Sequence, residues 1–420
     1  MVEVWLPYGE TEVCADIPTE NFYGTLEARE FKPSKPPEAL VQEAFEQPLE
    51  GLRLREVAKG GRAVILLDEY ASTLPLQALA AGILRELEEG GIRRENVTFV
   101  FGRGLEGAPY QLEEASRLLG GEAEGCRIIV HNPFEGDFEL AELGSTSRRV
   151  KVFIRRDVAE AEVKILVGRV SPHPYAGYSG LGQTLLSAAG SLRTLTRNYL
   201  LYGSLEARAG RLEGNPLQAE LLEAARMAGL TYAFHLACSW DGSLLKAFAG
   251  RPEETFRAAV GFFEEAFAST LEGKFRAVVA SPGGKPYDSS LEGALQALER
   301  VSDLVEEGGS IVLAAECAGE RLDSTFLLWL SEAKSVEKAE ALFREKPERG
   351  FHKVLRLRRL QSKFRIYMVS GLPETISSEL LGFRTLRSLG EAVRLALRGI
   401  GKGRIIVVPQ ALKTLPKVKV

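Results

Sequence analysis

Residues 171–183, SPHPYAGYSGLGQ, place one histidine, two tyrosines, three glycines and two prolines in thirteen positions. They follow an apolar run, VKILVGRV, with the length and composition of a buried strand. Loops at the ends of buried strands carry much of the binding and proton-transfer chemistry of proteins. His173 is therefore predicted to transfer a proton or to orient a ligand, and a buried histidine bonded to a backbone carbonyl is the structural alternative.

Two other loops carry groups suited to chemistry. Asp68 and Glu69 end another apolar run, where carboxylates often serve a site, and capping of the following helix is the alternative. The turn SPGG, residues 281–284, follows a predicted strand and precedes a predicted helix. The amides of Gly283 and Gly284 are suited to an anion, and a merely tight turn is the alternative.

The elements that must position these groups alternate along the chain. A buried strand at 62–70, an amphipathic helix at 76–91 and a second strand at 96–104 form a βαβ unit, and the pattern restarts near residue 270. Such alternation predicts parallel sheets covered by helices, with ligands beyond the carboxyl ends of the strands. We expect an α/β protein of two Rossmann-like domains, residues 1–268 and 269–420, with a cleft between them. The stretch from 185 to 265 is predicted to be helical.

Composition excludes several classes of protein. The formal charge of −4 argues against nucleic-acid binding, and the basic stretch at 353–365 is expected to be the solvated face of a strand or helix. No run of eighteen apolar residues and no signal peptide are found, so we expect no membrane segment and a cytoplasmic location. The four cysteines and four histidines have no local metal-ligand spacing, and no residue is predicted to bind a metal directly.

The stretch HPYAGYSG, residues 173–180, resembles the H-x-F/Y-A-G-F/Y-S-G-G-x-K segment of the nickel-dependent lactate racemase family, which includes racemases and epimerases of other 2-hydroxy acids. Further segments resemble that family in the same order along nearly the whole chain: LPYG (6–9), ARAGRLEGNP (207–216), FAGRPEE (248–254), GGKPYD (283–288), AEC (315–317) and VVPQALKTLP (407–416). The order of these segments carries more weight than any one of them.

The resemblance implies a nickel ion held by a pincer-shaped pyridinium nucleotide. In the family this cofactor takes a hydride from the substrate and returns it, two histidines exchange the hydroxyl proton, a third histidine ligates nickel and a lysine tethers the nucleotide. By this resemblance, cofactor contacts are expected at Asp68, Glu69, Ser72, Gly177, Gly180, Gln183, Tyr199, Gly283 and Gly284.

Several positions depart from the family pattern. His173 matches one proton-transfer histidine, but Glu106 stands where the second is expected, with Gly107 in place of an arginine. Gln183 replaces the tethering lysine, and Tyr199 replaces the nickel-ligand histidine. Other polar positions of the pattern hold Ser72 instead of arginine, Gly293 instead of glutamine and Gln296 instead of lysine.

Two interpretations follow from these departures. In the first, the protein is a divergent 2-hydroxy-acid racemase or epimerase in which Glu106 and His173 are the two bases and the nickel nucleotide binds without a tether. In the second, it has lost the nickel chemistry and is a binding or regulatory protein, or a metal-free proton-transfer enzyme. The sequence favours the second slightly, and racemisation of lactate itself is not expected. Either way, the expected partner is a small anionic molecule in the interdomain cleft, while the substrate and the oligomeric state stay open.

Overall fold

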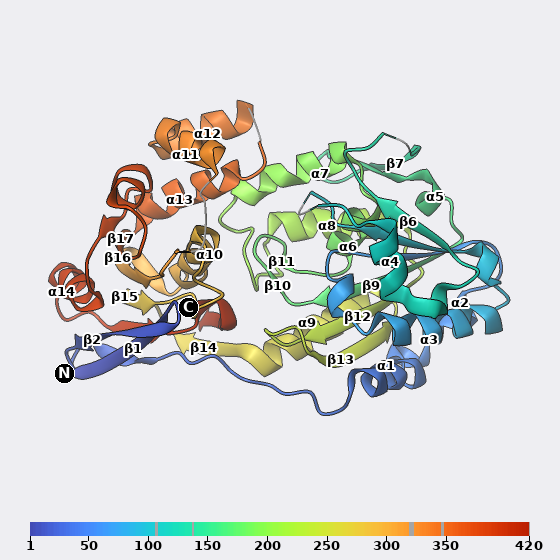
Figure 1. Cartoon of the computed structure of the whole chain (residues 1–420), viewed down its shortest axis with the longest axis horizontal. Helices are drawn as coiled ribbons and strands as arrows, with labels where there is room; N and C mark the ends of the chain where they lie inside the picture. The colour runs from blue at the N-terminus through green and yellow to red at the C-terminus, as the bar shows by residue number, and fades with distance from the viewer. Residues whose placement is uncertain (106–107, 137, 319–322, 346–347, 420) are drawn as a thin grey trace. The chain divides into compact units, whose positions relative to one another are not determined.

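The computed structural model describes residues 1–105, 108–136, 138–318, 323–345 and 348–419. The chain forms two compact units (Figure 1): residues 31–266, here the 31–266 unit, and residues 1–30 with 267–420, here the split unit. No helix in the described ranges combines the length and apolar character needed to cross a membrane.

The 31–266 unit is built on a six-stranded sheet in the order β13-β12-β9-β4-β5-β6, parallel except for the β12–β13 pair. Its strands are β4 (Ala63–Leu67), β5 (Val97–Gly102), β6 (Arg127–His131), β9 (Val163–Val170), β12 (Tyr232–Cys238) and β13 (Leu244–Gly250), with the hairpins β7 (Leu140–Ser145)–β8 (Lys151–Arg155) and β10 (Pro172–His173)–β11 (Gly177–Tyr178). Its helices are α1 (Pro37–Glu46), α2 (Leu54–Val57), α3 (Leu76–Glu89), α4 (Leu112–Leu119), α5 (Arg156–Ala159), α6 (Gly182–Ala189), α7 (Leu192–Tyr199), α8 (Pro216–Ala228) and α9 (Pro252–Phe267).

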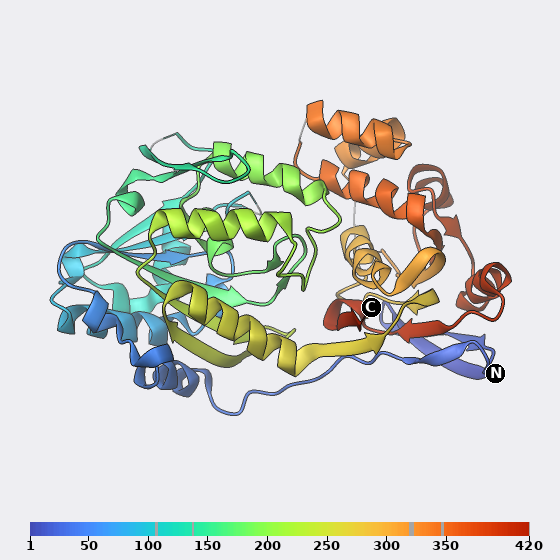
Figure 2. The same cartoon turned by 180° about the vertical axis from the view of Figure 1, so that it is seen from behind.

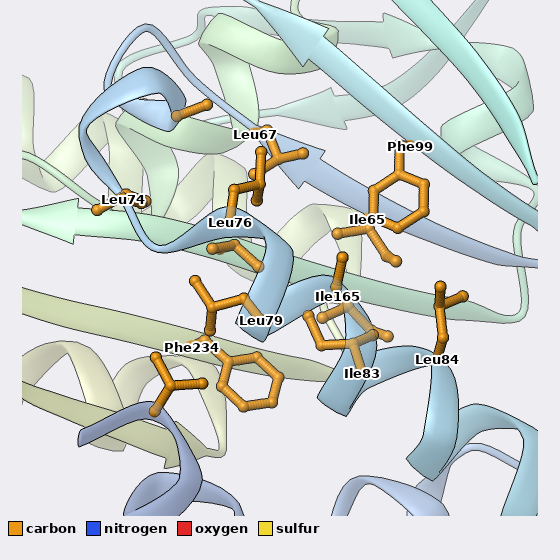
Figure 3. Close-up of a cluster of buried hydrophobic side chains, with 14 of the residues drawn as sticks. Ile65, Leu67, Leu74, Leu76, Leu79, Ile83, Leu84, Phe99, Ile165 and Phe234 are labelled. Atoms are coloured by element: carbon orange, nitrogen blue, oxygen red, sulfur yellow. The ribbon is translucent and has the colours of Figure 1, made fainter. Parts of the chain in front are cut away.

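The core of this unit forms where α3 packs on the sheet. Leu76, Leu79 and Ile83 recur at helical spacing, and they cover strand residues such as Ile65 and Ile165 (Figure 3). Helices α6, α8 and α9 lie on the opposite face (Figure 2), because alternate strand residues point there. In a parallel sheet, the loops that lead from a strand to the next helix lie at the carboxyl edge. The loops after β4, β5 and β9 therefore lie at this edge, as the βαβ pattern predicts.

The split unit has a second six-stranded sheet, wholly parallel, in the order β18-β17-β16-β15-β19-β3. Its strands are β1 (Val2–Tyr8), β2 (Thr11–Ile17), β3 (Phe22–Thr25), β14 (Ala268–Glu272), β15 (Phe275–Ala280), β16 (Val305–Ala314), β17 (Arg365–Val369), β18 (Arg384–Thr385), β19 (Ile405–Val408) and β20 (Leu415–Lys419). Its helices are α10 (Leu291–Ser302), α11 (Ser324–Glu332), α12 (Val336–Glu345), α13 (Phe351–Lys363) and α14 (Leu389–Ile400).

The first thirty residues belong to the split unit, whereas the sequence analysis grouped them with residues up to 268. The reason is burial: Val4, Leu6 and Ile17 of the β1–β2 hairpin pack with α14 in the core of this unit. Strand β3 also pairs with β19, far along the chain. Both parts of the fold are α/β with largely parallel sheets, as predicted.

The basic stretch at 353–365 does not form the solvated face that the sequence analysis expected. It lies largely in α13, where Arg356 is 1% exposed and Arg358 is 7% exposed. Arg356 makes two charge-assisted hydrogen bonds to Glu299 of α10, at 2.6 and 2.7 Å. Pairing of this kind is what allows an arginine to be buried.

Candidate functional site

A small pocket in the 31–266 unit brings together several of the predicted site residues. Its cavity volume is about 50 Å³, room for roughly three to five water molecules. Leucines of α6, α7 and α8 supply apolar walls, and Glu69, Arg103, His173, Gln183, Ser187, Asn198 and Tyr202 supply polar groups. A mostly apolar cavity with a few converging polar groups is the usual form of a small-molecule site.

His173 lines this pocket from the β10–β11 hairpin. Its Nδ1 accepts hydrogen bonds from the backbone N–H groups of Tyr175 (3.2 Å) and Ala176 (2.9 Å). A nitrogen that accepts cannot carry the proton, so the neutral ring is protonated on Nε2. Burial lowers the pKa of His173 to about 4, and the ring is therefore neutral at pH 7. The structure thus presents a neutral N–H donor.

Two of the predicted glycines shape the loop that carries His173. Gly177 has φ +82°, and a Cβ there would lie 2.1 Å from the carbonyl oxygen of Arg211. Gly180 has φ +99°, and its Cβ would meet the ring of His235 at 3.1 Å. Both positions need glycine for conformation and for close approach. They hold the backbone, and neither lines the pocket.

Asp68 and Glu69 follow β4, as predicted, but their surroundings differ. Asp68 is fully buried; it accepts hydrogen bonds from the Thr184 hydroxyl and the Tyr70 amide. Glu69 lines the pocket, its Oε1 accepts from Gln183, and its Oε2 is buried with no partner among the described residues. Burial raises the pKa of both carboxyls, and the neighbouring Asp68 raises that of Glu69 further.

Gln183 occupies the first turn of α6 and is held by its surroundings. Its Nε2 donates to Oε1 of Glu69 at 2.7 Å and to Oγ of Ser187 at 3.2 Å. Its Oε1 accepts from the amide of Gly180 at 3.4 Å. Both amide donors are therefore committed inside the unit, and the side chain orients the Glu69 carboxyl.

Tyr199 is buried at the end of α7 and contacts the ring of Tyr202, with centroids 5.1 Å apart. Tyr202 in turn packs on Tyr175 at 4.6 Å, beside His173. The pocket wall at this end is thus aromatic. The adjacent Asn198, 5% exposed, lines the pocket, and its Oδ1 is buried with no partner among the described residues.

Arg103 is the pocket's cationic side chain, but its charge is already matched. Its Nη2 donates to Glu114 at 2.7 Å, its Nη1 donates to the carbonyl of Ala108, and the guanidinium lies over the ring of Tyr110. The described lining therefore offers a ligand no unpaired positive charge.

The remaining predicted residues lie elsewhere. Ser72 is exposed in a short 3-10 turn and does not line this pocket, and Glu106 lies outside the described residues. Gly283 and Gly284 belong to the split unit, where their turn packs on the β1–β2 hairpin: the Gly283 amide donates to Ser281 Oγ, and a Cβ on Gly284 would meet Pro7 at 3.0 Å. The geometry agrees with the tight-turn alternative.

Comparison with known proteins identifies the family. The lactate racemase N-terminal domain matches residues 8–210. Lactate racemase from Thermoanaerobacterium thermosaccharolyticum is 23% identical over 430 residues, which cover 100% of each chain. The matched domain and the full-length relative together support a lactate racemase-like family for this chain.

Two further comparisons agree with that assignment. Lactate racemase from Lactiplantibacillus plantarum is 23% identical over 320 residues, 75% of each chain. The lactate racemase apoprotein structure from T. thermosaccharolyticum matches the fold with a TM-score of 0.82 at 22% identity, and covers 99% of this chain and 100% of that one. The lactate racemase-like fold therefore extends over the whole chain.

Within this lactate racemase-like scaffold, sequence reasoning missed two residues of the site. His235 stands among apolar residues in the sequence, which indicates only a buried strand position, and it is fully buried in β12, but its Nε2 also accepts a hydrogen bond from the amide of Leu181 at 3.1 Å, just before α6. Asn198 precedes Tyr199 in the sequence and carries no feature there that marks it as a site residue. Its position in the last turn of the amphipathic helix α7 is a signal that it faces inward, but periodicity does not show that its oxygen lacks a partner.

Proposed function

We propose that this lactate racemase-like protein binds a small hydroxylated or carbonyl compound in the pocket around His173, and that it works without a tethered nickel nucleotide. The observation that carries the proposal is the hydrogen bond from Gln183 to Glu69. The side chain at the tether position is an amide that is already committed to a neighbouring carboxyl, so it has neither the amine nor the freedom to form a covalent link.

The other donors near the pocket also fit the nickel nucleotide poorly. Because such a nucleotide carries its metal, the protein needs to supply only a tether and a lone pair of suitable basicity. His173 directs its lone pair at two backbone amides, and Tyr199 is a phenol buried against Tyr202. Phenol oxygen is a weak substitute for neutral imidazole as a ligand of nickel. We therefore derive no step through the cofactor.

The chain's own residues suit binding and polarisation of a ligand. His173 donates from Nε2, as neutral histidines do in enzymes that polarise a carbonyl. The cavity also has an apolar lining for the carbon atoms of a ligand, from Leu186, Leu195, Leu217 and Leu221. Asn198 Oδ1 accepts from a hydroxyl or amide group of the ligand.

Metal-free proton transfer is the second candidate function. The resemblance pairs His173 with Glu106, which lies outside the described residues. What favours proton chemistry in the described residues is the buried carboxyl of Glu69, which lines the same cavity as His173. A carboxyl in such surroundings is a suitable acid or base near neutral pH.

Metal content tests the proposal. The protein is co-expressed with the cofactor-synthesis enzymes of the family, purified under native conditions and examined by native mass spectrometry and elemental analysis. An authentic lactate racemase loaded in parallel is the positive control, and the variant Gln183→Lys/Tyr199→His restores the family residues at both positions. We expect no nickel in the wild type and no racemisation of lactate. A stoichiometric nickel nucleotide on the wild type would overturn the proposal.

A further inference from the structure

The pocket around His173 contains buried polar atoms that the protein leaves unsatisfied. Oε2 of Glu69 and Oδ1 of Asn198 both lie in buried positions without hydrogen-bond partners in the described part of the chain, and both side chains line the cavity. Buried polar atoms are nearly always paired in folded proteins, by the protein, by water or by a ligand. Two such atoms at one cavity therefore indicate a site built for a bound molecule.

The hydrogen bonds of Glu69 fix where its proton resides. Oε1 accepts from Gln183 at 2.7 Å, so Oε1 is the oxygen that acts as the acceptor. Oε2 accepts no hydrogen bond from the described residues, although the Ser187 hydroxyl interacts with the same carboxyl, so an anionic oxygen at this position would be buried with little compensation. Burial and the neighbouring Asp68 also raise the pKa of Glu69, which favours the protonated carboxyl. Glu69 thus presents an O–H donor at Oε2.

A second neutral donor lines the same cavity. His173 is protonated on Nε2, because Nδ1 accepts two backbone N–H groups. Two neutral donors suit a carbonyl oxygen, which accepts two hydrogen bonds and gains negative charge when the ligand is polarised. The remaining unsatisfied atom, Asn198 Oδ1, requires a donor such as a hydroxyl group.

The charge of the lining limits the ligand class further. Arg103 is paired with Glu114, and His173 is neutral, so a carboxylate in the cavity would find no unpaired counter-charge in the described lining. Burying an unpaired charge costs more free energy than burying a neutral polar group of the same size. The sequence analysis expected an anionic ligand, and this electrostatic balance favours an uncharged one. A cavity of about 50 Å³ suits a molecule of few heavy atoms.

We propose that Glu69 and His173 act as a pair of neutral donors to one carbonyl oxygen, and that the ligand is a small uncharged α-hydroxycarbonyl compound whose hydroxyl group donates to Asn198. The proposal rests on the proposed function, in that the pocket must bind a small molecule. It deepens that function by assigning Glu69 to ligand binding in addition to its contact with Gln183.

The test compares two molecules of nearly the same shape, lactamide and lactate, by calorimetric titration of the full-length protein at pH 6.5. We expect lactamide to bind about tenfold more tightly than lactate, because only lactate brings an unpaired charge. Glu69→Leu should weaken lactamide binding about fivefold, the size expected for one neutral hydrogen bond. Glu69→Gln keeps a neutral donor and should bind as the wild type does.

A second measurement at pH 9 keeps the proposal testable if Glu69→Leu does not fold. Raising the pH removes the Glu69 proton, so wild-type affinity for lactamide should fall, whereas Glu69→Gln should be unaffected. Among the described residues, the other ionisable groups near Glu69 are Asp68, which interacts with both Glu69 and Arg169, and the cavity-lining Tyr202, His173 and Arg103, the last paired with Glu114. Gln183 and Ser187 of α6 do not titrate in this range. His173 is already neutral at pH 6.5, and the Gln variant controls for the others.

Three results would overturn the inference: lactate binding as tightly as lactamide, no binding of either compound, or loss of lactamide binding in Glu69→Gln equal to that in Glu69→Leu. These titrations use protein without cofactor, whereas the proposed function is tested by metal content. Nickel loading together with preferential lactamide binding would therefore reject the proposed function alone.

Discussion

His235 does not line the cavity, but it positions the backbone that leads into α6. Its Nε2 accepts the amide of Leu181, so Nδ1 carries the proton and donates to Thr255 Oγ1 at 2.8 Å, and the Thr255 hydroxyl donates to the carbonyl of Arg251. Leu181 has φ +42°, a conformation that non-glycine residues rarely adopt. The imidazole thus holds the backbone in an unfavourable conformation directly before the turn that carries Gln183.

Replacing His235 should therefore destabilise the protein. In His235→Leu the Leu181 amide and the Thr255 hydroxyl each lose a buried partner, and we expect a loss of about 1–3 kcal/mol in the free energy of unfolding. His235→Gln keeps an acceptor for the amide and should lose less. Urea denaturation of both variants measures the difference, and equal stability of Leu and Gln variants would contradict the assigned hydrogen bonds.

The residue types predicted many of the residues at the site, but they did not predict the protonation or the hydrogen bonds of those residues. The position of His173 at a strand end and the Gln183 and Tyr199 departures could be read from the sequence. The tautomer of His173 could not be predicted from the sequence, because it depends on which backbone amides donate hydrogen bonds to Nδ1. The engagement of Gln183 by Glu69 joins residues far apart in sequence, and no local pattern encodes it.

At the scale of elements, the strands and helices of the βαβ pattern follow from periodicity, and the exceptions have physical causes. The helical pattern that begins at residue 291 does not mark its own end: α10 ends at Ser302 and β16 begins at Val305, since VEEGG continues into a buried apolar run. The 185–265 stretch, predicted to be helical, also contains β12 and β13. The basic stretch in α13 was misinterpreted because buried arginines alternate there with apolar residues, as solvated ones would.

Arg358 shows what such a buried arginine does for neighbouring elements. Its guanidinium donates to the carbonyls of Leu330 and Ala333 at the end of α11, and to those of Leu380 and Leu381. Helix ends leave carbonyl groups without partners, and one planar five-donor group satisfies several of them.

We expect Arg358→Lys to destabilise the protein by about 2–4 kcal/mol, because a single ammonium cannot reach these oxygens and leaves them buried unsatisfied. The matched control is Arg359→Lys on the same helix, where the arginine pairs with Glu340 and is partly exposed. An exposed pair contributes little, so this control should lose less than about 1 kcal/mol. Chemical denaturation of both variants measures the loss in the free energy of unfolding. Equal losses in the two variants would show that the hydrogen bonds of Arg358 to the four carbonyls do not stabilise the protein.

At the scale of the whole molecule, buried ionisable groups should give stability a maximum near neutral pH. Burial lowers the pKa of all four histidines, to about 4 for His131 and His173 and about 3 for His235. Below pH 6.5 the unfolded chain binds protons that the folded chain cannot, so stability falls with falling pH. Asp68 and Glu69 have raised pKa values, so the folded chain binds more protons, and their contribution falls as pH rises from about 4.5 through neutrality.

The four histidines outnumber the two carboxyls, so the unfolding free energy should rise up to about pH 6.5 and then decline. Thermal unfolding measured between pH 5 and pH 9 tests this profile. Glu69→Gln removes one titrating carboxyl, so it should flatten the alkaline decline and steepen the rise between pH 5 and pH 6.5, where Glu69 opposes the histidines. Parallel declines of wild type and variant above pH 7 would show that Glu69 is not responsible.

The division of the chain into a continuous unit and a split unit leads to a prediction about which pieces fold. Residues 31–266 contain their own sheet and core and should unfold cooperatively as a separate fragment. Residues 267–420 alone should not unfold cooperatively, because they lack the β1–β2 hairpin that covers α14, the β3 partner of β19 and the Gly9 amide that donates to Asp288.

The two segments of the split unit meet at the point where residues 31–266 are inserted between them, since the Arg29 guanidinium donates to the carbonyl of Ala268 at 3.1 Å. Joining residues 1–30 to 267–420 through a short glycine-serine linker should therefore restore a cooperative unfolding transition. Circular dichroism and calorimetry of the three fragments test this, and a 267–420 fragment as stable as the linked one would show that the first thirty residues are dispensable to that core.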